Sequence, residues 1–136
     1  MNTQINENFV SFEVAKLLKE KGFDCSCEHQ YINCSSGYPF LTDIRDDAGC
    51  YYKNSEIGQD EYSAPTLQMA MKWLRGLYWL NMYPKYNKWS NKWSIVILSL
   101  DDREVIKGNT SIQMDGFISY EEAVNEGIKY CLTNLI

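Results

Sequence analysis

Cys25, Cys27 and His29 are spaced by two residues, and Cys34 lies a little further along the chain. Residues two apart on a strand share one face, so these thiol and imidazole side chains would lie close together. Zinc takes ligands of these two kinds, and a thiolate beside a histidine base can act as a nucleophile. The sequence therefore offers one candidate for a zinc site or for a thiol-dependent site.

A plainer interpretation is that these cysteines are small buried apolar side chains. Cys25-x-Cys27 is tighter than the usual zinc knuckle, and no second knuckle follows. Nothing in the sequence supplies an oxyanion donor or a group that would orient the imidazole. The chain has five cysteines, an odd count that fits reduced thiols better than a complete set of disulfides. We favour burial and expect no metal or cofactor.

Asp46-Asp47 and Asp101-Asp102 are pairs of carboxylates that would suit a divalent cation. Adjacent residues of a strand point to opposite faces, and both pairs fall in segments expected to be loops. Aspartate is common in loops because its side chain stabilises turns. The sequence contains no phosphate-binding glycine loop, nucleophile elbow or metalloprotease helix motif. We therefore expect that the protein is not an enzyme.

The segment 62–100 has an unusual composition. It contains no Asp or Glu, and it holds all four tryptophans and the five cations Lys72, Arg75, Lys85, Lys88 and Lys92. In a chain with a net charge of -5, such a segment is either the packing centre of the fold or a surface that meets an anionic partner. Trp73 and Trp93 belong to elements with an apolar face, so we expect both in the core.

Trp89 differs because it falls in a predicted hairpin turn, where burial is hardest to arrange. We expect its ring to be exposed and to belong to a binding surface formed by Tyr83, Lys85, Tyr86, Lys88, Trp89 and Lys92. Aromatic rings beside cations suit a protein partner, and they also suit stacking on single-stranded nucleic acid. The alternative is that the lysines only keep an edge hairpin soluble.

The spacing of apolar residues and the capping residues predict three helices. Ser11 caps the first, and Gly22 ends it. Pro65 suits the first turn of the second. Ser119 and Glu122 form a capping box for the third, and Gly127 on its apolar face permits close approach to a sheet. The expected helices span residues 11–21, 64–78 and 120–134.

Short strands are expected at 27–34, 39–44, 50–53, 80–86, 92–100 and 111–114, with turns at 46–49 and 87–91 and a loop at 54–61. The strand 92–100 is apolar on both faces, which predicts a central strand that is covered on each side. The expected fold class is α+β, a mainly antiparallel sheet with three helices packed on it. At 136 residues the chain is most simply one domain, 1–136, with an acidic part at 1–61 and a helix–strands–helix part at 62–136.

Charge and hydropathy limit where the protein is expected to be located and what it is expected to bind. The N-terminus has no signal-peptide pattern, and the longest apolar run is far too short to span a bilayer, so a cytoplasmic protein without membrane contact is expected. The pI near 4.8 disfavours general binding of nucleic acid. Residues 1–65 hold five basic and eleven acidic side chains, and 66–136 hold eight and seven. The acidic part is therefore a possible partner for the basic segment, within one chain or between molecules.

The order of these motifs resembles small uncharacterised proteins encoded by bacterial phages and mobile elements. The resemblance rests on the helix starts Ser11-Phe12-Glu13-x-Ala15 and Ser119-Tyr120-Glu121-x-Ala123, on Lys72-Trp73-Leu74-Arg75, and on the strand bearing Trp93. The C-terminal half is similar to the phage ABA-sandwich domain. The resemblance covers about residues 9–24 and 62–134; it implies a fold and an origin and assigns no functional residue.

These observations favour a small non-enzymatic accessory protein of phage or mobile-element type, which binds a protein partner or itself through the hairpin. Single-stranded nucleic-acid binding by the same hairpin is one alternative. A zinc-binding or thiol-dependent protein centred on Cys25, Cys27 and His29 is the other.

Overall fold

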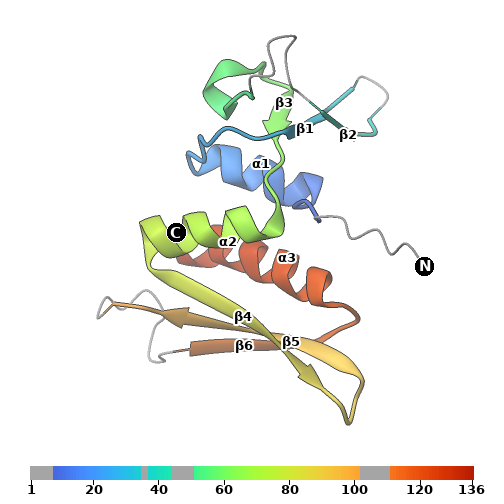
Figure 1. Ribbon diagram of the computed structural model, residues 1–136, viewed down its shortest axis with the longest axis vertical. Coiled ribbons are helices and arrows are strands. Elements are labelled where there is room, and N and C mark those ends of the chain that lie inside the picture. The colour runs from blue at the N-terminus through green and yellow to red at the C-terminus, as the bar shows by residue number, and fades with distance from the viewer. Residues whose placement is uncertain (1–7, 35–36, 44–50, 102–110) are drawn as a thin grey trace, which may run out of the picture.

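The computed structural model describes residues 8–34, 37–43, 51–101 and 111–136. Its elements lie in layers, which run from top to bottom in Figure 1. A small sheet lies at one end, followed by α1 (Phe12–Glu20), by the pair α2 (Leu67–Tyr78) and α3 (Tyr120–Tyr130), and by a larger sheet. Because α1 contacts both the small sheet and α3, the helices connect the two sheets.

The three predicted helices are all present, and each begins at a capping side chain. The hydroxyls of Ser11, Thr66 and Ser119 accept hydrogen bonds from the amides of Val14, Met69 and Glu122. The second helix starts later than predicted, because Ser63 belongs to a strand and Thr66 is the cap. Pro65 therefore precedes the helix, and the prediction that it lies in the first turn is wrong. The third ends as an α-helix at Tyr130 and continues as a π-helical turn over Cys131–Leu135.

The α+β class is confirmed, but the antiparallel strands form two sheets instead of one. The larger sheet has the order β4 (Leu80–Asn87), β5 (Lys92–Ser99) and β6 (Ser111–Phe117). The smaller has the order β2 (Phe40–Asp43), β1 (His29–Ile32) and β3 (Glu61–Ser63). The predicted hairpin, its central second strand and the edge strand from Ser111 are therefore confirmed.

Predictions for the small sheet are less accurate. The predicted strands at 27–34 and 39–44 are present as the shorter β1 and β2. A strand at 50–53 is wrong for the described residues 51–53, since Tyr52 makes only an isolated bridge with Cys27. The predicted loop 54–61 contains a 3-10 turn (Asn54–Glu56) and the start of β3. Residue 50, the turn predicted at 46–49 and residues 102–110 lie outside the described residues.

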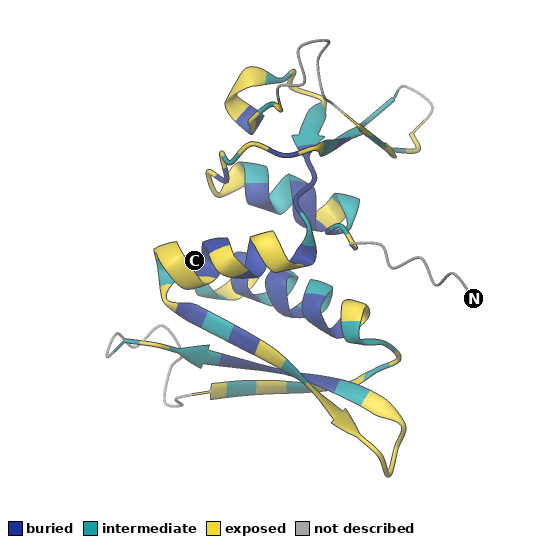
Figure 2. Cartoon of the chain, in the orientation of Figure 1, coloured by how far each residue is buried: buried dark blue, intermediate teal, exposed yellow. Residues whose placement is uncertain are grey.

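The core is one cluster that runs from the helix side of the larger sheet past α2 and α3 to α1, and its buried residues are dark blue in Figure 2. Met82 pairs with Ile97, and both side chains are buried on the helix side. A Cβ atom added to Gly127 would lie 2.7 Å from Cγ1 of Ile95 and 3.2 Å from Sδ of Met82. Only glycine therefore allows α3 to approach β4 and β5 this closely, as predicted.

The opposite face of the larger sheet has no helix over it among the described elements (Figure 1). The prediction that the central strand is covered on both sides is wrong for this part of the chain. Val96 is nevertheless buried, at 5% exposure, because its neighbours across the strands are the side chains of Tyr83 and Gln113. Cross-strand neighbours therefore shield this apolar residue without a second layer.

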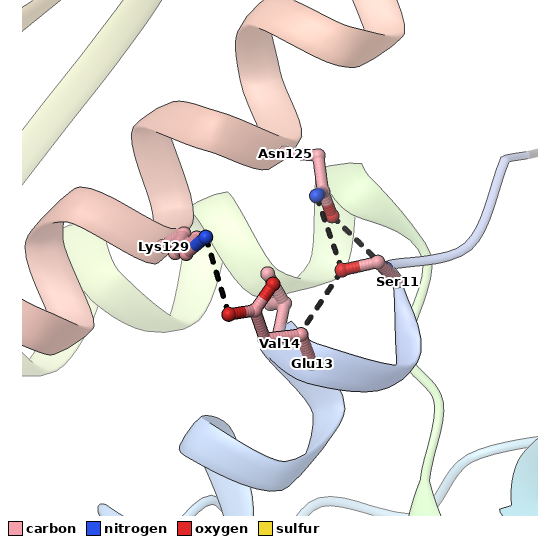
Figure 3. Close-up of polar contacts among 5 residues, drawn as sticks. All are labelled: Ser11, Glu13, Val14, Asn125 and Lys129. Carbon is pink, nitrogen blue, oxygen red and sulfur yellow. Dashed lines mark hydrogen bonds and ion pairs between the residues drawn. The ribbon is translucent and has the colours of Figure 1, made fainter.

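Polar contacts join α1 to α3 (Figure 3). The backbone amide of Ser11 donates to Oδ1 of Asn125 at 2.9 Å, and Nδ2 of Asn125 donates to the Ser11 hydroxyl at 3.1 Å. Lys129 lies 3.2 Å from a carboxylate oxygen of Glu13, which raises the Lys129 pKa. This ion pair is exposed and contributes little to stability, so the Ser11–Asn125 pair is the more important link.

No helix in the described part of the chain has both the length and the apolar character needed to cross a membrane.

Candidate functional site

The turn that joins β4 to β5 is ordered by side chains of its own sequence. Oδ1 of Asn87 accepts hydrogen bonds from the amides of Trp89 at 2.9 Å and Ser90 at 3.4 Å. Asn91 adopts the left-handed conformation with φ 57°, which asparagine tolerates better than most residues. The hydroxyl of Tyr86 donates to Oδ1 of Asn91 at 2.9 Å. The backbone around Trp89 is therefore fixed on both sides of the turn.

The indole of Trp89 is 93% exposed, the highest value among the large apolar side chains that are exposed. The prediction that this ring stays in solvent is confirmed. Trp73, by contrast, is buried, and Trp93 packs against the edge of the core. The prediction of a core position is thus confirmed for Trp73, whereas Trp93 is only partly buried.

Strand alternation and register place Tyr83, Lys85 and Lys92 on the outer face of the sheet. Lys85 pairs with Ser94 and Tyr83 with Val96, whereas the neighbouring residues Met82 and Ile97 face the helices. Tyr86 falls on the helix side by the same alternation and is 51% exposed. Its ring lies 5.2 Å from that of Trp93, which in turn meets Tyr120 edge to face at 5.5 Å. This chain of rings connects the hairpin to α3.

The turn and the outer face together form an open cleft of about 620 Å³. Five of the six predicted binding residues line it, namely Lys85, Tyr86, Lys88, Trp89 and Lys92. Tyr83 does not line the cleft, although it is exposed on the same face as Lys85. Residues of β4, of the turn and of β5 thus line the same cleft.

Asp115 also lines the cleft, and the sequence did not identify it. The side chains of Ser94 and Gln113 donate to its Oδ1 at 2.6 Å and 2.8 Å. These hydrogen bonds, with a smaller contribution from Lys85, hold the Asp115 pKa below its ordinary value, so the carboxylate is charged at neutral pH. The cleft therefore presents three lysines and one carboxylate, a net positive surface in an acidic protein.

A β-bulge explains why Asp115 was missed. The register between β5 and β6 shifts between Trp93 and Ile95, where Gly116 adopts φ 92°. The strand continues through this bulge to Phe117, beyond the predicted end at residue 114. Glycine at 116 after a polar residue is the one sequence signal that could have indicated it.

The cysteine and histidine group does not form a ligand set in the structure. Within the described ranges, no group of three or more His, Cys, Asp or Glu side chains is placed to hold a metal ion. The ring of His29 packs 4.4 Å from Phe9, and the thiol of Cys27 donates weakly to the carbonyl of Cys25 at 3.4 Å. Cys34 is half-buried beyond the end of β1.

Thiol chemistry at Cys27 is disfavoured by its surroundings. Burial raises the pKa of the Cys27 thiol to about 12, with Cys25 adding to the effect. Burial likewise raises the pKa of Cys131 to about 12. Because the thiolate is the nucleophile and the metal ligand, both thiols are unreactive near neutral pH. The packing role that we favoured fits Cys27, which is buried in the core, whereas Cys25 and Cys34 are only partly buried.

No protein-family model, no curated protein and no solved structure matches this chain. The phage or mobile-element origin and the similarity to an ABA sandwich therefore stay predictions.

Proposed function

We propose that this protein is a non-enzymatic binding protein whose β4–β5 hairpin docks on an acidic, partly apolar surface of a partner protein. The observation that carries the proposal is the ordered turn that holds the Trp89 ring in solvent at a cleft lined also by Lys85, Lys88 and Lys92. Tryptophan is among the residues that contribute most to protein interfaces, particularly where it can enter a pocket. An accessory role of phage or mobile-element type is part of this proposal.

Solubility alone is a weaker account of the hairpin. Lys85 and Pro84 on the edge strand β4 do protect that edge from pairing with other chains. Edge protection gives no reason for a strongly exposed tryptophan at the tip, nor for the hydrogen bonds that order the turn, which Asn87 accepts and Tyr86 donates. An ordered turn lowers the entropy lost on binding, which supports a docking role.

Single-stranded nucleic acid is the alternative ligand, because an open sheet face with lysines and rings suits stacked bases. The Asp115 carboxylate in the cleft and the low pI both oppose a polyphosphate ligand. A fluorescence titration with a mixed single-stranded oligonucleotide at low salt separates the two ligands. If the oligonucleotide quenches tryptophan emission and the quenching disappears as salt is raised, the ligand is nucleic acid and not a partner protein.

The proposal is tested with the full chain as bait in extracts of its host cells. Trp89→Ala and Lys88→Glu should each reduce capture of a partner at least about tenfold, a typical effect for an interface anchor. Ile118→Ala is the matched control, since Ile118 is 76% exposed and does not line the cleft. Equal capture by all four proteins would contradict the proposal.

A further inference from the structure

A groove of about 360 Å³ lies where α1, the small sheet and the start of α3 meet. Its volume is within the range of pockets that receive a single ligand or side chain. Apolar and acidic side chains share its lining. The residues that line it are Asn8, Phe9, Ser11, Tyr31, Leu41, Leu67, Glu121, Glu122 and Asn125.

The charge of this groove is opposite to that of the hairpin cleft. Glu121 and Glu122 are both exposed, and no cation is among the lining residues that the structure describes. Glu122 is held in place, because one of its carboxylate oxygens accepts the amide of Ile118 at 2.8 Å. Leu41 is 39% exposed beside them, so the groove also offers apolar surface.

We infer that the occupant of this groove is the hairpin tip of a second copy of the chain. The Trp89 ring would cover the apolar lining at Leu41, and Lys88 would lie against Glu121. This inference rests on the proposed function, since it uses the same tip and names its partner. The support is charge complementarity: a chain of net charge -5 carries a basic, ring-bearing projection and an acidic, partly apolar groove.

The contact joins two different surfaces of the chain, because the hairpin cleft and the groove have no lining residue in common. In Figure 1 the tip of the hairpin extends away from the helices at the end of β4 and β5. The helix α1 and the start of α3 both lie on the helix-covered side of the larger sheet. Two copies can exchange tips reciprocally in a closed dimer, or successive copies can form an open chain.

Sedimentation velocity on the full chain, from micromolar to about 1 mM, tests the inference over the range of weak association. The wild-type chain should associate with itself, and this association should be weaker at high salt because salt screens the opposite charges. Lys88→Glu and Glu121→Lys should each weaken association about fivefold or more, because each reversal places like charges together. Lys72→Glu, a reversal at an exposed lysine of α2 outside both sites, should have no effect.

The decisive sample is an equal mixture of Lys88→Glu and Glu121→Lys. Each tip then meets a groove of opposite charge, so association should return to near the wild-type level. A wild type that stays monomeric throughout, or a mixture no better than its components, would overturn the inference. Either result would leave the proposed function standing if the wild type captures another protein from host-cell extracts and Trp89→Ala does not. If Trp89→Ala captures the same proteins as the wild type, the proposed function itself is overturned.

Discussion

The hydroxyl of Tyr86 donates a 2.9 Å hydrogen bond to Oδ1 of Asn91, across the base of the turn that carries Trp89. Asn91 also has the positive φ of 57° that the turn requires. One residue thus supplies both the backbone conformation and the acceptor that order the proposed docking surface. The separate effects of these two properties can be measured.

Asn91→Gly should keep the turn conformation and lose only the hydrogen bond, whereas Asn91→Val should lose both. A β-branched residue in the left-handed region is strained by about 1–2 kcal/mol, so the Val variant should be destabilised by that amount relative to Gly. Chemical denaturation of both variants measures the difference. Equal stabilities would show that the turn adopts another conformation in solution.

Trp89→Ala should change the free energy of unfolding by less than about 0.5 kcal/mol, because the ring is in solvent. Trp73→Ala should lower it by about 3–5 kcal/mol, since this ring is buried and meets Phe23 at 5.4 Å and Tyr78 at 5.2 Å. Urea titration of the two variants provides the comparison. A large loss of stability at position 89 would mean that its ring packs against the protein.

Gly127→Ala should lower stability by about 1–3 kcal/mol, because the new methyl group would overlap Ile95 in the helix–sheet contact. Gly76→Ala is the matched control on the exposed side of α2, where nothing lies within 4 Å of the new Cβ. It should be neutral or stabilising by up to about 1 kcal/mol, from helix propensity. A neutral Gly127→Ala would argue against the close approach of α3 to the sheet.

Stability should fall as pH rises above about 9, through the buried Cys131 thiol. Its pKa is about 12 in the folded protein and 9.0 in the ordinary state, so between these values only the unfolded chain loses the proton. Each pH unit should then remove about 1.4 kcal/mol through this one group. Cys131→Ala lowers the absolute stability but should make the slope of unfolding free energy against pH shallower by that amount. Parallel slopes for wild type and variant would contradict a buried neutral thiol.

The sequence predicted best those elements whose local signals agree with their packing. The helices 11–21, 64–78 and 120–134 have capping residues and apolar stripes at helical spacing, and the structure differs from them mainly at their ends. The hairpin was predictable because a polar turn lies between apolar strands. Exposure of Trp89 followed from its place in that turn.

The small sheet was harder to predict because its stability comes from distant contacts. β3 has only three residues, and its place depends on pairing with β1 and on Asn54. The side chain of Asn54 donates to the carbonyl of Phe23 and accepts from the amide of Ser63, each at 2.8 Å. No local pattern indicates such a bridge. The outer face of the larger sheet was predicted wrongly for a similar reason, since Tyr83 and Gln113 shield Val96 from neighbouring strands.

Photo-crosslinking from position 89 in the full chain, expressed in its host cells, tests the docking claim most directly. A benzophenone side chain replaces Trp89 in one protein and, in the control, Leu77, which is 62% exposed and lines neither the cleft nor the groove. We predict a specific adduct from position 89 with an acidic protein surface, on another protein or on a second copy of this chain, and none from position 77. Equal labelling from both positions, or an adduct only with nucleic acid, would contradict a protein-docking hairpin.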